Sequence, residues 1–91
     1  MAEQEIIMYA TEWCGDCKRS RRLLDKLNIS YKVIDIDQDK TGNQFVRNIN
    51  KGNASVPTIV FPNGIILVEP SDEELINHIH NIQMENVRNN I

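Results

Sequence analysis

The chain has two cysteines, Cys14 and Cys17, and the pattern around them constrains the fold more than any other feature. An apolar run, Ile6 to Ala10, precedes the pair, and residues 5–10 are predicted to form a short buried strand. Residues 15–28 follow with leucines that share one face of a helix, so the pair falls at a predicted helix start. A helix N-terminus carries unpaired N–H groups and a partial positive charge, which favour a thiolate over a thiol. The C-x-x-C pair therefore predicts thiol–disulfide exchange.

Two other uses of the cysteine pair are weighed against exchange chemistry. A structural disulfide here would close a very short loop, which constrains the unfolded chain little. A zinc site would need further ligands, and His78 and His80 are the histidines available. Those two lie two residues apart on a predicted helix, so they point to different faces. Redox chemistry is the favoured interpretation, and no metal is expected.

The rest of the chain continues an alternating pattern of strands and helices. Residues 31–36 predict a second strand, and strand, helix and strand in succession predict a parallel unit with a right-handed crossover. Residues 40–51 predict a second helix. Asn63-Gly64 lies between two apolar runs, 58–61 and 65–68, which predicts a β-hairpin because both turn residues tolerate positive φ.

A last helix is predicted to begin at Ser71, where Glu74 three residues later completes a capping box. Residues 85–91 are polar and are expected to form a fraying tail. The chain is then a single domain, 1–91, with a core over about 5–84. The order β-α-β-α-β-β-α predicts an α/β fold with a central four-stranded mixed sheet and helices on both faces. The cysteines follow the first strand, at the sheet edge where the sites of such folds gather.

Composition narrows the function classes. The net charge is −3, which gives no reason to expect a nucleic-acid partner. No apolar run approaches the roughly 18–20 residues that span a bilayer, so no membrane contact is expected. Residues 1–5 are acidic and lack the basic-then-apolar order of a signal peptide. We therefore expect a cytoplasmic monomer, in a compartment where disulfides are transient and catalytic.

Taken together, these motifs resemble the glutaredoxins, which have the thioredoxin fold, and especially the short bacterial glutaredoxin-like proteins that include mycoredoxins. The resemblance covers about residues 5–80 and rests on Thr-x-Trp-Cys-Gly at Thr11 to Gly15, Gly52-Asn53 ahead of Val56-Pro57-Thr58, Phe61 with Asn63-Gly64, and Ser71-Asp72. It implies a dithiol oxidoreductase that reduces protein disulfides or small-thiol mixed disulfides. A low-molecular-weight thiol, glutathione or another bacterial thiol, is the implied co-substrate, and no bound cofactor is expected.

The two cysteines are expected to have different roles. Cys14 comes first, where the helix end stabilises a thiolate most, so it is the expected nucleophile. Cys17 lies one turn deeper and would resolve the mixed disulfide. Trp13 is expected to be partly exposed beside Cys14, as an apolar platform for a substrate.

The resemblance adds two further expectations. It implies that the Val56–Pro57 bond is cis and faces the cysteines, which leaves the Val56 backbone for an extended substrate. It also implies that Ser71 and Asp72 hold the γ-glutamyl end of glutathione. The alternative for this pair is an ordinary helix cap, which the sequence alone favours.

Three positions depart from the glutaredoxin pattern. Thr11 stands where many members have lysine, Gly15-Asp16 replaces Pro-Tyr, and 67–70 lacks the usual Gly-Gly. The negative charge of Asp16 disfavours a neighbouring thiolate, and the basic run 18–22 partly offsets it. The basic run itself is interpreted as the solvated face of the helix.

These departures leave the electron source open between a small thiol and a thioredoxin-reductase-like enzyme. The alternative function is accordingly a thioredoxin-like electron donor recycled by such a reductase. A third hypothesis, ranked below both, is an iron–sulfur cluster binding module built from two subunits.

Overall fold

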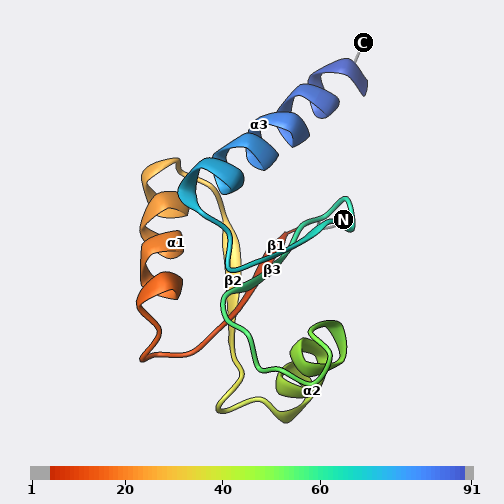
Figure 1. Cartoon of the computed structure of the whole chain (residues 1–91). Helices are drawn as coiled ribbons and strands as arrows, with labels where there is room; N and C mark the ends of the chain where they lie inside the picture. Colours follow the sequence, from red (N-terminus) through yellow and green to blue (C-terminus); the bar gives the residue numbers. More distant parts are fainter. Residues whose placement is uncertain (1–4, 90–91) are drawn as a thin grey trace.

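The computed structural model describes residues 5–89, and its elements follow the predicted order. They are β1 (Ile6–Ala10), α1 (Gly15–Lys26), β2 (Tyr31–Asp35), α2 (Lys40–Ile49), β3 (Thr58–Val60), β4 (Ile66–Val68) and α3 (Asp72–Asn89). Figure 1 shows α1 and α3 together on one side of the strands and α2 on the other. In the part of the chain that the structure describes, no helix is long and apolar enough to cross a membrane.

The strands form one mixed sheet in the order β2-β1-β3-β4. β1 pairs in parallel with β2, with Ile6 opposite Tyr31 and Ala10 opposite Asp35. β3 runs antiparallel to β1, and β4 runs antiparallel to β3. The thioredoxin-like α/β fold with a four-stranded mixed sheet and helices on both faces is therefore confirmed.

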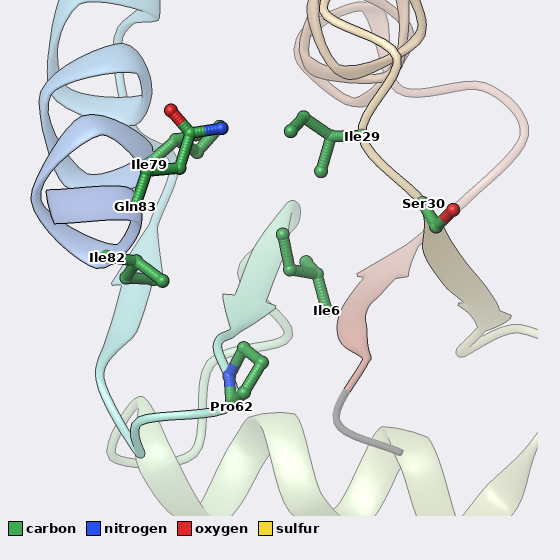
Figure 2. Close-up of a pocket in the computed structure, with 7 residues that line it drawn as sticks. All are labelled: Ile6, Ile29, Ser30, Pro62, Ile79, Ile82 and Gln83. Carbon is green, nitrogen blue, oxygen red and sulfur yellow. The ribbon is translucent and has the colours of Figure 1, made fainter. Parts of the chain in front are cut away.

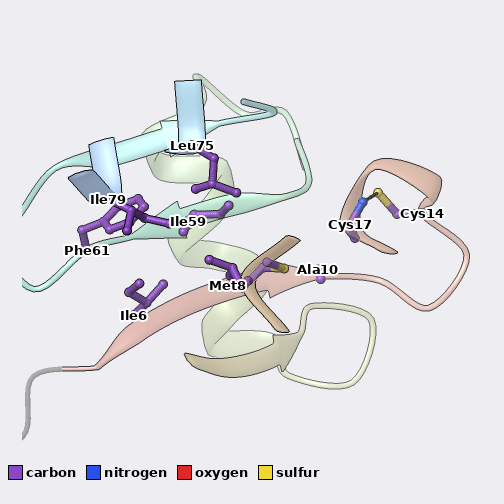
Figure 3. Packing of buried hydrophobic residues seen from close by; sticks show 10 residues of the cluster. Ile6, Met8, Ala10, Cys14, Cys17, Ile59, Phe61, Leu75 and Ile79 are labelled. Carbon is purple, nitrogen blue, oxygen red and sulfur yellow. Dashed lines mark hydrogen bonds between the residues drawn. The ribbon is translucent and has the colours of Figure 1, made fainter. Parts of the chain in front are cut away.

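The main core lies between the sheet and the helices α1 and α3. Alternate residues of β1 are buried, because successive side chains of a strand point to opposite faces. The cluster contains Ile6, Met8, Ala10, Cys14, Cys17, Leu24, Ile59, Phe61, Leu75 and Ile79. Figure 3 shows the two cysteines at one end of this cluster and Ile6, Phe61 and Ile79 at the other.

The second helix packs very close to the opposite face of the sheet. A Cβ atom at Gly42 would lie 2.9 Å from the Ile34 side chain, so this position of α2 has no room for a larger residue. Tyr9 on β1 and Phe45 on α2 also stack there, with ring centroids 4.9 Å apart. The glycine that weakens the helical pattern in the sequence thus allows α2 to approach the strands.

The ends of α1 and of the hairpin strands lie close to where the local sequence predicts them. Asn28 has a φ of +59°, which ends the turn after α1 near its predicted stop. The hairpin strands are each one residue shorter than predicted, but the Phe61 N–H still donates to the Ile65 carbonyl at 2.9 Å.

The prediction of a fraying tail from residue 85 is wrong over residues 85–89. Helix α3 continues to Asn89, because this stretch holds no glycine or proline that would end a helix. Residues 90–91 lie outside the described residues.

Candidate active site

Cys14 is the N-cap of α1. Its Sγ accepts a hydrogen bond from the Cys17 backbone N–H at 3.1 Å, as Figure 3 shows. A serine or aspartate oxygen usually fills this position at a helix start. The sulfur therefore sits where the helix offers a free donor and a favourable dipole to a negative charge.

Cys17 lies one turn deeper and is the more buried thiol. It is 1% exposed, against 8% for Cys14, and both thiols are free. Burial raises the pKa of Cys17 to about 12, helped by the hydrogen bond with Cys14 and opposed by a backbone hydrogen bond from Thr11. Cys17 is therefore protonated at neutral pH, which makes it a poor first nucleophile.

The segment before β3, which contains Val56 and Pro57, lies next to Cys14. The Val56–Pro57 bond is cis, as expected from the resemblance. The Cys14 thiol donates to the Val56 carbonyl, with the sulfur 3.8 Å from the oxygen. A side-chain bond from Thr58 to the Ser55 carbonyl, at 2.8 Å, fixes this segment. The structure thus brings Cys14, Val56 and Pro57 together.

Trp13 projects from the loop before α1 and is 73% exposed, in agreement with the sequence expectation. Its Nε1 donates to Oδ2 of Asp37 at 3.0 Å. Asp37 lies in the loop after β2, and sequence reasoning assigned it no role at the site. The signal that could have found it is topological, since β1 and β2 are parallel and their carboxyl ends meet at one edge.

Thr11 belongs to the site through its backbone rather than its side chain. It is 5% exposed, and its hydroxyl has no hydrogen-bond partner within the described residues. The hydroxyl oxygen is itself buried. Its part in thiol binding stays a prediction.

Ser71 and Asp72 form the start of α3. The Ser71 N–H donates to Glu74 Oε1 at 2.8 Å, and the Glu74 N–H donates to the Ser71 hydroxyl at 3.1 Å. This is the predicted capping box, so the cap interpretation is confirmed. Binding of a γ-glutamyl group by this pair stays a prediction.

Arg19 is the residue that sequence reasoning missed. It was counted with the solvated basic run, yet its Nη1 donates to Oδ1 of Asp72 at 2.6 Å. Its Nη2 donates to the Pro70 carbonyl at 3.3 Å and lies 3.5 Å from Oδ1 of Asp16. The hydrogen bond to Asp72 raises the pKa of the guanidinium further, so the cation is permanent. One arginine therefore joins the C-x-x-C motif to the start of α3.

No group of three histidine, cysteine, aspartate or glutamate residues able to hold a metal ion exists among the residues that the structure describes.

The comparisons with known proteins agree with this site. Residues 6–66 match the family model of the glutaredoxins, which is more than half of the chain. The chain belongs to the glutaredoxin family. Glutaredoxins are thiol–disulfide oxidoreductases, and in this chain Cys14 and Cys17 lie close together at the start of α1.

Individual relatives support the family assignment. The chain is 36% identical over 75 residues to the Mycobacterium tuberculosis protein Rv3198A, named as a glutaredoxin, covering 82% of this chain and 89% of that one. It is 35% identical over 71 residues to mycoredoxin 1 of Corynebacterium glutamicum, covering 78% and 87%.

Solved structures support the fold alone. The glutaredoxin of Archaeoglobus fulgidus superposes with a TM-score of 0.68 at 24% identity, over 86% of this chain and 88% of that one. The thioredoxin-like protein BC3987 superposes with a TM-score of 0.70 at 22% identity, over 80% and 97%.

Proposed function

We propose that this glutaredoxin reduces protein disulfides or small-thiol mixed disulfides, with Cys14 as nucleophile and Cys17 as resolving thiol. The observation that carries the proposal is the contrast between the two sulfurs. Cys14 caps the helix and accepts the Cys17 N–H at 3.1 Å, whereas burial keeps Cys17 protonated. The thiolate is the attacking species in exchange, so the first step belongs to Cys14.

The reaction then balances in two exchanges. The Cys14 thiolate attacks one sulfur of the substrate disulfide, whose S–S bond breaks, and the leaving thiolate takes up a proton. Cys17 loses its proton and attacks the Cys14 sulfur, which releases the second substrate thiol and leaves a Cys14–Cys17 disulfide. The substrate gains two electrons and two protons. The Cys14–Cys17 disulfide is later reduced by external thiols.

The order of the two steps follows from what raises the Cys17 pKa. Burial is the largest cause, but the hydrogen bond and the charge of Cys14 add to it. Both contributions of Cys14 vanish once its sulfur is bonded to the substrate. Cys17 therefore becomes easier to ionise only after the mixed disulfide has formed, which delays resolution until it is useful.

Trp13 and Val56 are proposed to form the substrate-facing rim. The exposed indole beside Cys14 offers an apolar surface, held in place by Asp37. The Val56 backbone precedes the cis proline next to the Cys14 sulfur, where an extended substrate could pair with it. The rim thus suits a disulfide carried on a peptide.

The proposed electron source is a low-molecular-weight thiol, with glutathione as one member of the class. A carboxylate-binding lysine is replaced by buried Thr11, and the Asp72 carboxylate is already held by Arg19. Because of these two features, the proposal includes other bacterial thiols as well as glutathione. A cytoplasmic location and a monomeric state remain part of the same proposal, since transient catalytic disulfides belong to reducing compartments.

The experiment is the intact mass of the Cys17→Ser protein after incubation with oxidised cell extract. This variant can form a mixed disulfide at Cys14 and cannot resolve it, so we expect a stable adduct whose mass identifies the thiol. Cys14→Ser is the matched control, and it should stay free of adduct. A small adduct supports the small-thiol source, whereas protein adducts alone favour the donor recycled by a thioredoxin reductase. An unmodified Cys14 would overturn the redox assignment of this residue.

A further inference from the structure

Arg19 has three oxygen partners drawn from two separate parts of the chain. Two belong to the start of α3, the Asp72 carboxylate at 2.6 Å and the Pro70 carbonyl at 3.3 Å. The third is the carboxylate of Asp16 at 3.5 Å, and Asp16 lies between the two cysteines. The guanidinium thus joins the carboxylate between the two cysteines to the carboxylate at the start of α3.

The arrangement is more specific than a surface ion pair. Exposed pairs are individually weak, and the side chains of Asp16 and Asp72 are 57% and 49% exposed. Arg19 is 35% exposed, and its planar fork reaches a backbone carbonyl as well as two carboxylates. A fork held by three acceptors on two elements has a fixed position, which a single flexible pair does not.

The fixed position matters because of the charges next to the sulfurs. Asp16 contributes to the raised pKa of Cys17, so its negative charge is felt inside the site. Arg19 lies five residues after Cys14, about 7.5 Å along the helix axis. The Debye length is about 30 Å at 0.01 M salt, so at low ionic strength a charge on this part of α1 still acts on the sulfur. The cation therefore offsets the acidic residue that interrupts the C-x-x-C motif.

We propose that Arg19 is a positioning residue of the thiol site, which clamps Asp16 and Asp72 and cancels their charge where an anionic thiol or disulfide must approach Cys14. This inference rests on the proposed function, in which Cys14 is the attacking sulfur. It gives one member of the basic run a role that the others do not share. Arg22, an exposed arginine of the same helix, is the matched control because it removes an equal charge farther from Cys14.

The test compares two alkylating reagents on the reduced protein at fixed pH and low ionic strength. Iodoacetate is an anion and iodoacetamide is neutral. The rate constant for iodoacetate divided by that for iodoacetamide therefore measures the electrostatic potential at Cys14. A change in the thiolate fraction cancels in this ratio. We expect Arg19→Gln to lower this ratio about twofold, and Arg22→Gln to leave it near the wild-type value. Arg19→Lys, which keeps the charge, should restore most of the ratio, and salt should abolish the difference.

A second pair of variants separates charge from folding. Asp16→Asn should raise the ratio, and adding Arg19→Gln to it should bring the ratio back toward wild type. If Arg19→Gln alone fails to fold, the comparison of Asp16→Asn with the double variant still measures the effect of losing the cation. In the double variant no Asp16 carboxylate is left without its partner. A ratio that is equal in folded wild type and in folded Arg19→Gln, or equal in Asp16→Asn and in the double variant, would overturn the proposal.

The two proposals fail in different ways. If Cys17→Ser traps a mixed disulfide at Cys14 while the reagent ratio does not move, only the role of Arg19 is wrong. If Cys14 is not trapped at all, the proposed function fails whatever the ratio shows.

Discussion

The two ends of the main core differ in what holds them together. At one end, Cys14 forms hydrogen bonds with the Cys17 N–H and the Val56 carbonyl, and Arg19 joins Asp16 to Asp72. At the other end, a cavity of about 210 Å³ opens between α3, the start of β1 and the segments that lead into β2 and out of β3. Figure 2 shows its lining, which is Ile6, Ile29, Ser30, Pro62, Ile79, Ile82 and Gln83.

The apolar cavity therefore lies at the opposite end of the core from the two cysteines. An apolar pocket is the usual first guess for a binding site, but here its lining contains neither cysteine. The thiol end is shaped by hydrogen bonds and charges, and the apolar end by contacts between apolar side chains. Substitutions at the first should therefore change reactivity more than stability, and substitutions at the second should do the reverse.

The largest expected effect belongs to the nucleophile. Cys14→Ser should lower the rate of mixed-disulfide reduction by about a thousandfold or more, because it removes the attacking thiolate. Cys17→Ser should keep part of the activity when excess small thiol can resolve the mixed disulfide. The measurement is steady-state reduction of a small mixed disulfide, with circular dichroism as the check on folding. Full activity in Cys14→Ser would contradict the expectation that substitutions at the thiol end change reactivity.

The next effect tests the apolar end. Ile79 is 6% exposed and belongs to both the core and the cavity lining, so Ile79→Ala should cost about 2–4 kcal/mol of unfolding free energy. Urea unfolding measures this cost, and the rate of Cys14 alkylation in the folded variant should match the wild type. A change in alkylation as large as the change in stability would mean that the two ends are coupled.

Sequence patterns predicted the features that depend on neighbours along the chain. The strand β1, the capping box at Ser71 and Glu74, and the helix start at the cysteines are all set within a few residues. The cis bond before Pro57 came from the family resemblance and not from local chemistry.

The missed features are contacts between residues far apart in sequence. Arg19 and Asp72 are 53 residues apart, and Trp13 and Asp37 are 24 apart. Local rules place Arg19 on a basic helix face without saying which of its neighbours meets an acidic partner. That choice is made by the packing of α1 beside α3, which only the tertiary structure provides.

The third prediction concerns alkaline pH and the buried thiol. The folded state raises the pKa of Cys17 to about 12, so it holds this proton more tightly than the unfolded chain does. Unfolding then releases a proton once the pH exceeds the ordinary value near 9, and stability falls as pH rises toward 12. Between neutral pH and pH 10.5 the loss should reach about 2 kcal/mol.

Cys17→Ser is the comparison for this loss. The serine variant lacks the group, so its unfolding free energy should fall less over the same pH range. Tyr9 and Tyr31, whose pKa values are also raised by burial, are present in both proteins and cancel in the difference. Parallel curves for the two proteins would show that the Cys17 environment does not contribute.

The smallest effect tests the polar contacts at the thiol end. Asp37→Ala removes the acceptor of the Trp13 indole, an exposed bond whose loss should cost about 0.5 kcal/mol. Trp13 is the single tryptophan, so time-resolved fluorescence anisotropy reports its motion directly. We expect faster local depolarisation in Asp37→Ala and about a twofold loss of activity on a protein disulfide, since the ring no longer keeps one orientation.

Asp37→Asn retains an acceptor oxygen and should behave like the wild type, which separates the hydrogen bond from the charge. Unchanged anisotropy in Asp37→Ala would mean that loop packing alone holds the indole, so the thiol end would owe its shape to the same kind of contact as the apolar end.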